Sequence, residues 1–264
     1  MTIKRTLVAT LCAFAATVSI PVLAAPTVYF GEDLGAGGPG NMPNSFAARD
    51  QFTGVFAAVG VEGFESFSAG DTFPSAGNLT FTGSSITATL TGGLVRSSPF
   101  LARFAVNGTN YFESSFNQRI TFNTPVAGFG TFVVDANEVI NNPATVTVNG
   151  QTLTQAQIEA RPFDSVDGIF RVVTERSPGV FELLFAGGTF SASNSSAMFV
   201  GLVDAANPFS NIIFINGTSG LDSAFQDGFG YDQLIVASVV PEPATWGLVL
   251  LGMFGVAKRS RRRA

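Results

Sequence analysis

Alternating apolar and polar residues mark several short strands in the middle of the chain. Threonines alternate with apolar residues in 79–82 and 86–91, and the same period recurs in 145–148. Successive side chains of a strand point to opposite faces, so these segments would turn threonine to water and the apolar residues to the core. Two longer segments are different: 129–134 and 198–203 are apolar on both faces, as is the short run 212–215. These runs predict central strands that are covered on both sides.

Turn dipeptides separate these segments. Asn-Gly occurs at 107–108, 149–150 and 216–217, and Asp-Gly occurs at 167–168 and 227–228. Both dipeptides accept the positive φ angles of tight hairpins. About a dozen short strands joined in this way predict a mainly β fold, an antiparallel β-sandwich of jelly-roll type.

Residues 45–59 have the periodicity of a helix. Asn44 or Ser45 can cap its start and Gly60 its end. The apolar positions at helical spacing are Ala48, Phe52, Val55, Phe56 and Val59. We expect one helix here, packed against the sandwich, and a second, shorter helix at 155–160.

The first 24 residues have the layout of a secretion signal. Lys4 and Arg5 precede an apolar run, and small residues end at Ala24. This pattern predicts a signal peptide over 1–24 that is removed on export, leaving 25–239 as one β-rich ectodomain. The alternative is a retained anchor helix, for which the apolar run is short. Cys12 is the only cysteine, so the exported chain would contain no disulfide.

The final segment, 240–264, contains three parts in a fixed order. Pro241, Glu242 and Pro243 come first, and the prolines keep this stretch extended and accessible to an enzyme. An apolar run and a basic end follow. We expect 244–257 to insert transiently into the inner membrane, with the basic end on the cytoplasmic side.

The order of Val-Pro-Glu-Pro, apolar run and arginines resembles the PEP-CTERM sorting signal. The resemblance implies an exosortase as the processing partner, cleavage near Pro241–Pro243, and release to the cell surface or the extracellular matrix. It also implies an association with exopolysaccharide and biofilm. The alternative is an ordinary C-terminal membrane anchor. The segments 29–34, 62–67 and 229–234 are similar to those of several PEP-CTERM ectodomains, and that likeness implies no known catalytic activity.

The charge of the exported part narrows the range of partners. Residues 25–240 contain seven arginines, no lysine and eighteen acidic residues, a balance of −11, although the whole chain carries −5. Nucleic acids and anionic membrane surfaces bind clustered basic residues, so this composition argues against both as partners of the acidic body.

The chain contains no histidine, which excludes histidine-based nucleophile systems and histidine metal sites. Paired carboxylates remain as catalysts, and Glu62 and Glu65 are the nearest pair. Their odd separation places them on opposite faces of a strand unless Gly63 forms a bulge. We therefore expect a non-enzymatic surface or matrix protein, and a secreted glycan-active enzyme is the alternative.

Two binding predictions concern the loops. Aromatic platforms for sugars are scarce, because the only tryptophan lies in the tail, but polar sugar recognition through loop Asp and Asn stays open. Second, we expect a structural calcium ion (Ca²⁺) between the first and last strands, bound by Glu65, Asp227 and Asp232. The alternative is that Glu65 and Asp232 are surface charges or cap loop amides.

Overall fold

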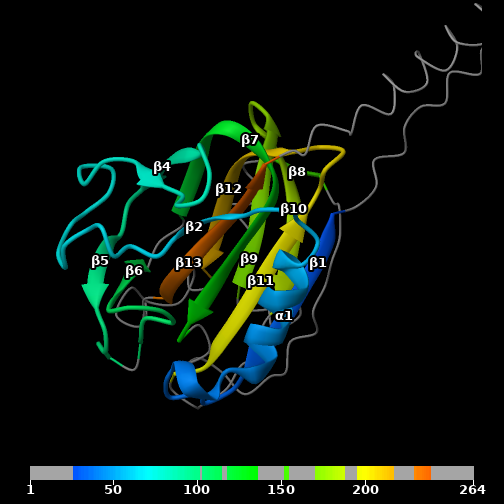
Figure 1. Ribbon diagram of the computed structural model, residues 1–264. Coiled ribbons are helices and arrows are strands. Elements are labelled where there is room, and N and C mark those ends of the chain that lie inside the picture. Colours follow the sequence, from blue (N-terminus) through cyan, green and yellow to red (C-terminus); the bar gives the residue numbers. More distant parts are fainter. Residues whose placement is uncertain are drawn as a thin grey trace, which may run out of the picture.

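Strands dominate the computed structural model, which describes residues 26–101, 103–114, 118–135, 152–154, 170–187, 195–216 and 229–238. Within these ranges, thirteen strands pair antiparallel in one continuous network beside a single α-helix (Figure 1). Their bounds are β1 (Thr27–Asp33), α1 (Pro43–Thr53), β2 (Gly60–Glu62), β3 (Leu79–Thr80), β4 (Thr87–Thr91), β5 (Leu94–Ser97), β6 (Asn110–Ser114), β7 (Gln118–Val134), β8 (Thr152–Thr154), β9 (Phe170–Ser177), β10 (Val180–Gly187), β11 (Ala197–Val203), β12 (Phe209–Asn216) and β13 (Phe229–Ser238). The mainly β, antiparallel prediction is confirmed.

Several predicted segments lie outside the described residues. They are the signal peptide 1–24, the tail 240–264, the strand at 145–148, the helix at 155–160 and, wholly or in part, every predicted turn dipeptide except Asn107-Gly108.

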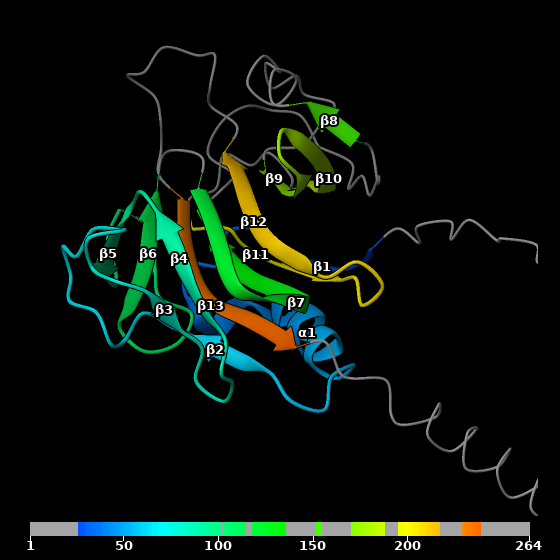
Figure 2. The ribbon, with the colours of Figure 1, turned by 90° about the horizontal axis from the view of Figure 1, so that it is seen from above.

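The long strand β7 joins two layers by arching from one to the other (Figures 1 and 2). Its first part pairs with β4 and β12, whereas its second part pairs with β11 and β13. The arch lies near Pro125, between Phe122 and Val126, where β7 turns Asn123, Thr124 and Pro125 to solvent. One layer therefore has the order β3-β4-β7-β12-β9-β10-β8, and the other contains β5-β6-β13-β7-β11-β1, with β2 also paired to β13.

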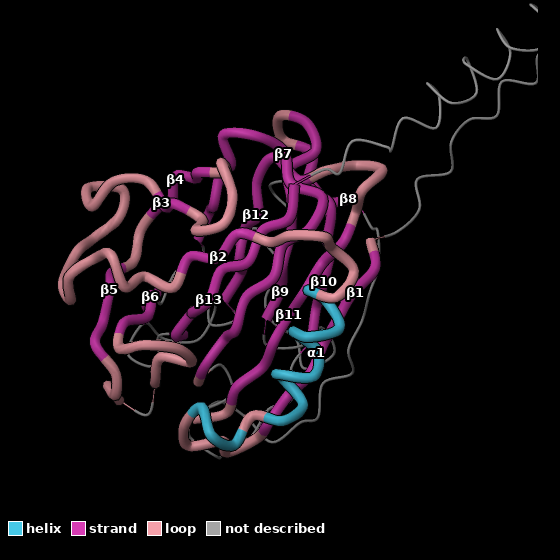
Figure 3. The backbone as a smooth tube through the Cα atoms, viewed as in Figure 1, coloured by secondary structure: helices cyan, strands magenta, loops and turns pink. Residues whose placement is uncertain are grey.

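The main core lies between these layers and contains many phenylalanines. The rings of Phe214 and Tyr231, one from each layer, stack 4.8 Å apart. The predicted alternation is confirmed in β4, where Ala88 and Leu90 are buried while Thr89 and Thr91 are exposed. Strand β11 is buried on both faces, as predicted, because α1 covers its outer side (Figure 3).

The helix prediction was right in place but wrong at both ends. Helix α1 begins at Pro43 and ends at Thr53, where the amide of Gly54 bonds the carbonyl oxygen of Asp50. Phe52 is fully buried against Gly201, where a Cβ would come within 2.7 Å of its ring. Val55 lies beyond the helix and is 51% exposed, because the chain has already turned toward β2.

The sandwich has two ends, which we name the exit pole and the far pole. At the exit pole Ser238 pairs with Val126, and Thr27 pairs with Val203, which is opposite Gly128 on β7. The first and last described strands therefore start and finish at the same end of the molecule. They are not neighbours, however: β1 pairs with β11, and β13 pairs with β2, β6 and β7. The predicted pairing of first and last strands is wrong for β1, since β11 and β7 separate it from β13. It holds for β2, which ends just before Glu65 and pairs with β13.

Candidate functional site

A bulge in β13 directs the Asp232 carboxylate into the protein. The register against β7 shifts between Asp232 and Ile235, and Gln233 takes a positive φ of 48°. Asp232 is fully buried, and its Oδ2 accepts hydrogen bonds from the amides of Val106 (2.7 Å) and Asn107 (3.0 Å). Its Oδ1 accepts the amide of Gln233 at 2.7 Å. Asp232 therefore holds the far-pole connection between β5 and β6.

Glu65 binds the same connection a few residues later. It follows β2, and so does not lie on the first strand as predicted. Its Oε1 accepts the amides of Thr109 (2.8 Å) and Asn110 (2.7 Å), and its Oε2 accepts the Thr109 hydroxyl at 3.1 Å. We call Glu65, Asp232 and the segment 106–110 the carboxylate clamp. The geometry matches the alternative reading of these acids, in which they cap loop amides.

The clamp leaves the calcium prediction untested. Asp227 lies outside the described residues, and no group of three or more His, Cys, Asp or Glu side chains gathers in metal-binding geometry within them. A calcium ion bound to Glu65 and Asp232 would compete with backbone amides for the same oxygens.

Asn107-Gly108 was predicted as a tight hairpin, and this was wrong. The dipeptide lies in a connection that runs from Ser98 to Thr109, because Ser97 pairs with Asn110. Gly108 does have a positive φ of 79°, and a Cβ there would collide with the Glu65 carboxylate.

We expect Gly108→Ala to destabilise the fold by more than Gly179→Ala. Both glycines have positive φ, 79° and 76°, so both variants carry the same backbone strain of about 1–2 kcal/mol. Gly179 has open space around its Cβ position, whereas Gly108 contacts Glu65. Urea unfolding of both variants measures the difference, and equal losses would show that Glu65 does not hold this loop.

Asp232 makes stability depend on pH. Burial raises the pKa of its carboxyl from 3.8 to about 7, although its three amide donors act in the opposite direction, and the nearby Glu65 carboxylate adds to the increase. The folded state thus holds this proton more tightly than the unfolded state, so the contribution of Asp232 to stability falls as pH rises between 3.8 and about 7.

We expect Asp232→Asn to flatten this part of the pH profile, because asparagine stays neutral throughout. Urea unfolding across that pH range tests the prediction. The matched control is Asp50→Asn, whose side chain is 65% exposed on α1 and should leave the profile unchanged. If Asp232→Asn showed the same pH profile as the wild type, the assignment of this pH dependence to Asp232 would be contradicted.

Glu62, the other acid considered for catalysis, is also engaged with backbone. It is buried, and its two oxygens accept the amides of Phe64 (2.7 Å) and Thr80 (3.1 Å). Burial raises the pKa of its carboxyl, against the effect of these amides. Glu62 and Glu65 therefore bind different loops, and do not face each other as a catalytic pair would.

A buried ion network that includes Arg103 of the connection between β5 and β6 was not predicted from the sequence. Arg103, 3% exposed, lies 3.4 Å from Glu113 and 3.5 Å from Asp135, and Arg96 lies 3.2 Å from Glu113. Asp135 also accepts the amide of Ser195 at 3.0 Å. This network joins three loops at the far pole, and the sequence contains no spacing that would have revealed it.

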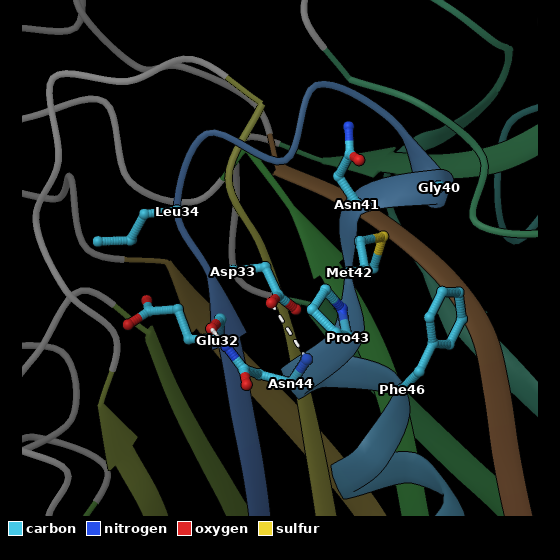
Figure 4. Close-up of a pocket in the computed structure, with 9 residues that line it drawn as sticks. All are labelled: Glu32, Asp33, Leu34, Gly40, Asn41, Met42, Pro43, Asn44 and Phe46. Carbon is cyan, nitrogen blue, oxygen red and sulfur yellow. Dashed lines mark hydrogen bonds between the residues drawn. The ribbon is translucent and has the colours of Figure 1, made fainter.

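A hollow of about 750 Å³ lies at the far pole, between the end of β1 and the start of α1 (Figure 4). Asp33 forms its base and caps the helix, since its oxygens accept the amides of Asn44 (3.1 Å) and Ser45 (2.8 Å). The cap was predicted from Asn44 or Ser45 themselves, so this prediction was wrong. Asn41 and Phe46 also line the hollow, which thus offers amide groups beside an aromatic ring.

The chain leaves the ectodomain directly before the sorting segment. Strand β13 is buried up to Ala237 except for the half-buried Gln233, and Ser238 is its last residue. A family model for the PEP-CTERM protein-sorting motif matches residues 239–263. The chain carries a PEP-CTERM sorting motif. It is therefore an exported protein whose tail is recognised for exosortase processing.

The predicted sorting residues Pro241, Glu242 and Pro243 lie within the matched PEP-CTERM segment but outside the described residues. In the described part of the chain, α1 is too short and too polar to cross a bilayer, and no other helix there could do so.

Outside the PEP-CTERM motif, the chain has little similarity to known proteins. No curated protein matches the chain. Among solved structures, the chain is similar to the K2 cleaved adhesin domain of Lys-gingipain, with 14% sequence identity and a TM-score of 0.38. The match covers 68% of this chain and 99% of that domain. A likeness this distant decides nothing about the function of this protein.

Proposed function

We propose that this protein is a non-enzymatic component of the cell surface or extracellular matrix that associates with secreted polysaccharide after exosortase processing. The PEP-CTERM motif at 239–263 carries this proposal. The motif accounts for export and sorting, and the proposal adds that the released ectodomain works by binding.

The state of the acidic side chains supports binding over catalysis. Glycosidases need two carboxyl groups that reach the scissile bond from opposite sides. Asp232 and Glu62 are buried and accept backbone amides, and Glu65 is used by the clamp. The glycan-active enzyme remains the alternative, with its carboxylates elsewhere in the chain.

The hollow at the far pole is our candidate for the sugar-binding surface. The side-chain nitrogens of Asn41 and Asn44 donate to the carbonyls of Ala36 and Glu32, which fixes both amide groups at its rim. Amide groups beside an apolar surface can recognise a sugar unit, and the acidic body favours neutral over anionic polysaccharide.

A glycan array and a reducing-sugar assay on the processed protein separate the two functions. Binding without release of reducing ends is expected, with weaker binding for Asn41→Ala and Asn44→Ala than for the control Asn78→Ala, at an exposed loop residue. Release of reducing ends from any bound glycan would favour the enzyme.

A structural calcium ion at Glu65, Asp227 and Asp232 stays part of the proposal. Thermal melts of the processed protein with calcium and with a chelator test it, and equal melting temperatures would exclude a stabilising ion.

A further inference from the structure

The exit pole is built from connections that contain no charged residue within the described part of the chain. It includes the loop between α1 and β2, the turn before β4, the arch of β7, the β9–β10 turn and the β11–β12 loop after Asp204. Their residues are 54–59, 83–85, 123–128, 177–180 and 205–208. In a body with a balance of −11, these described loops without charge form a distinct surface.

This surface is apolar as well as uncharged. Val55 is 51% exposed and Val180 is 38% exposed, which are large fractions for valine. Exposed alanines and a proline surround them: Ala57, Ala58, Pro125, Ala205 and Ala206. A shallow hollow of about 250 Å³ lies between the 54–59 loop and the 83–85 turn, and Ser238 lines it. The chain thus leaves the domain through this surface.

The charges nearest to the exit pole are held in ion pairs. Arg176 lies 2.5 Å from Glu182 and 2.8 Å from Asp204, and it also donates to the carbonyl of Asn207. Glu175 accepts the amide of Gly179, which lowers the pKa of its carboxyl together with the Arg119 guanidinium. The two arginines thus pair with three carboxylates beneath the loops, which leaves a net charge of −1 there.

The far pole differs in charge. It also exposes apolar side chains, Leu34 at 50% and Leu101 at 68%, but Glu32, Glu65 and Arg96 lie among them. Exposed apolar residues alone therefore do not distinguish the poles. At the exit pole, exposed apolar residues occur in described loops that contain no charge. Strand β13, from which the tail continues, also ends at this pole.

We propose that the exit pole rests on the lipid surface of the membrane until the tail is cut. This inference depends on the membrane insertion of 244–257 that the sequence predicts. The tail reaches Gly247 nine residues after Ser238, a span of at most about 32 Å when fully extended. Pro241 is only three residues from Ser238, at most about 11 Å. The tether thus holds the pole close to the bilayer.

The electrostatics favour this orientation over any other. Anionic lipid headgroups repel an acidic protein surface, and the repulsion acts within about one Debye length, roughly 8–10 Å. Resting on the described loops without charge keeps the acidic residues of the far pole away from the headgroups. Exposed valine, alanine and proline side chains can then enter the interface. The far pole with its hollow would point away from the membrane.

The test uses the full-length chain in vesicles of phosphatidylethanolamine and phosphatidylglycerol with brominated acyl chains. Cys12→Ser removes the natural cysteine, and single cysteines at Val55, Val180, Leu101 or Leu250 carry an environment-sensitive fluorophore. Leu250 reports on insertion of the tail, and Leu101 at the far pole is the matched control. We expect severalfold stronger quenching at Val55 and Val180 than at Leu101. A Val55→Glu substitution should reduce the quenching at Val180.

The outcomes separate the membrane contact of the exit pole from the tail insertion on which it depends. Quenching at Leu250 with equally weak signals at Val55, Val180 and Leu101 would overturn the membrane contact and leave tail insertion intact. No quenching at Leu250 would overturn tail insertion, and the membrane contact with it. Shielding of Val55 that requires co-reconstituted exosortase would assign the pole to that enzyme and overturn the lipid contact.

Discussion

Arg103→Ala is expected to destabilise the folded ectodomain by about 3–5 kcal/mol, because it removes a buried guanidinium that lies against two buried carboxylates. Arg103 is 3% exposed and lies within 3.5 Å of both Glu113 and Asp135. Arg96 still lies 3.2 Å from Glu113 in the variant. The loss of electrostatic stabilisation is therefore larger at Asp135 than at Glu113. Urea unfolding of the processed protein measures the loss.

The control for this prediction is Arg49→Ala. Arg49 pairs with Asp50 at 2.7 Å on the surface of α1, where Asp50 is 65% exposed. Such exposed pairs contribute about 0–1 kcal/mol. A loss at Arg103 no larger than that at Arg49 would contradict the structural role of the buried network.

Replacing Pro241, Glu242 and Pro243 together by alanine is expected to abolish removal of the tail. Without the prolines the segment can continue into helix, and the features recognised in the PEP-CTERM motif are lost. The protein should then stay in the membrane fraction. Fractionation of host cells followed by immunoblotting measures its distribution.

Thr245→Ala is the matched control, because it changes a neighbouring residue and keeps the Pro-Glu-Pro sequence. This variant should be released like the wild type. Release of the triple-alanine variant at wild-type levels would show that these residues are not the sorting signal.

The parts of the fold that follow local rules could be predicted from the sequence. The alternation in β4 and the apolar run of β11 set which faces are buried, whatever the topology. The arch of β7 could not be predicted, since a continuous strand and a strand shared by two layers have the same pattern over 118–134. The early end of α1 at Thr53 depends on Gly54 and on the path of the chain to β2.

The candidate site depends on tertiary contacts, and for this reason prediction was partial. Glu65 and Asp232 were named together as ligands of a predicted calcium ion, and the structure brings both to the segment 106–110. Their partners, the amides of 106–110, depend on the bulge in β13, which no local signal marks. Arg103 and Asp135 meet only because β7 returns to the far pole.

The central claim is that this exported chain is processed at both ends, and mass spectrometry of the protein secreted by its host tests it most directly. The secreted protein is predicted to lack residues 1–24 and the tail from Trp246 onward. A peptide containing Leu248–Val256 in that secreted material would contradict the claim.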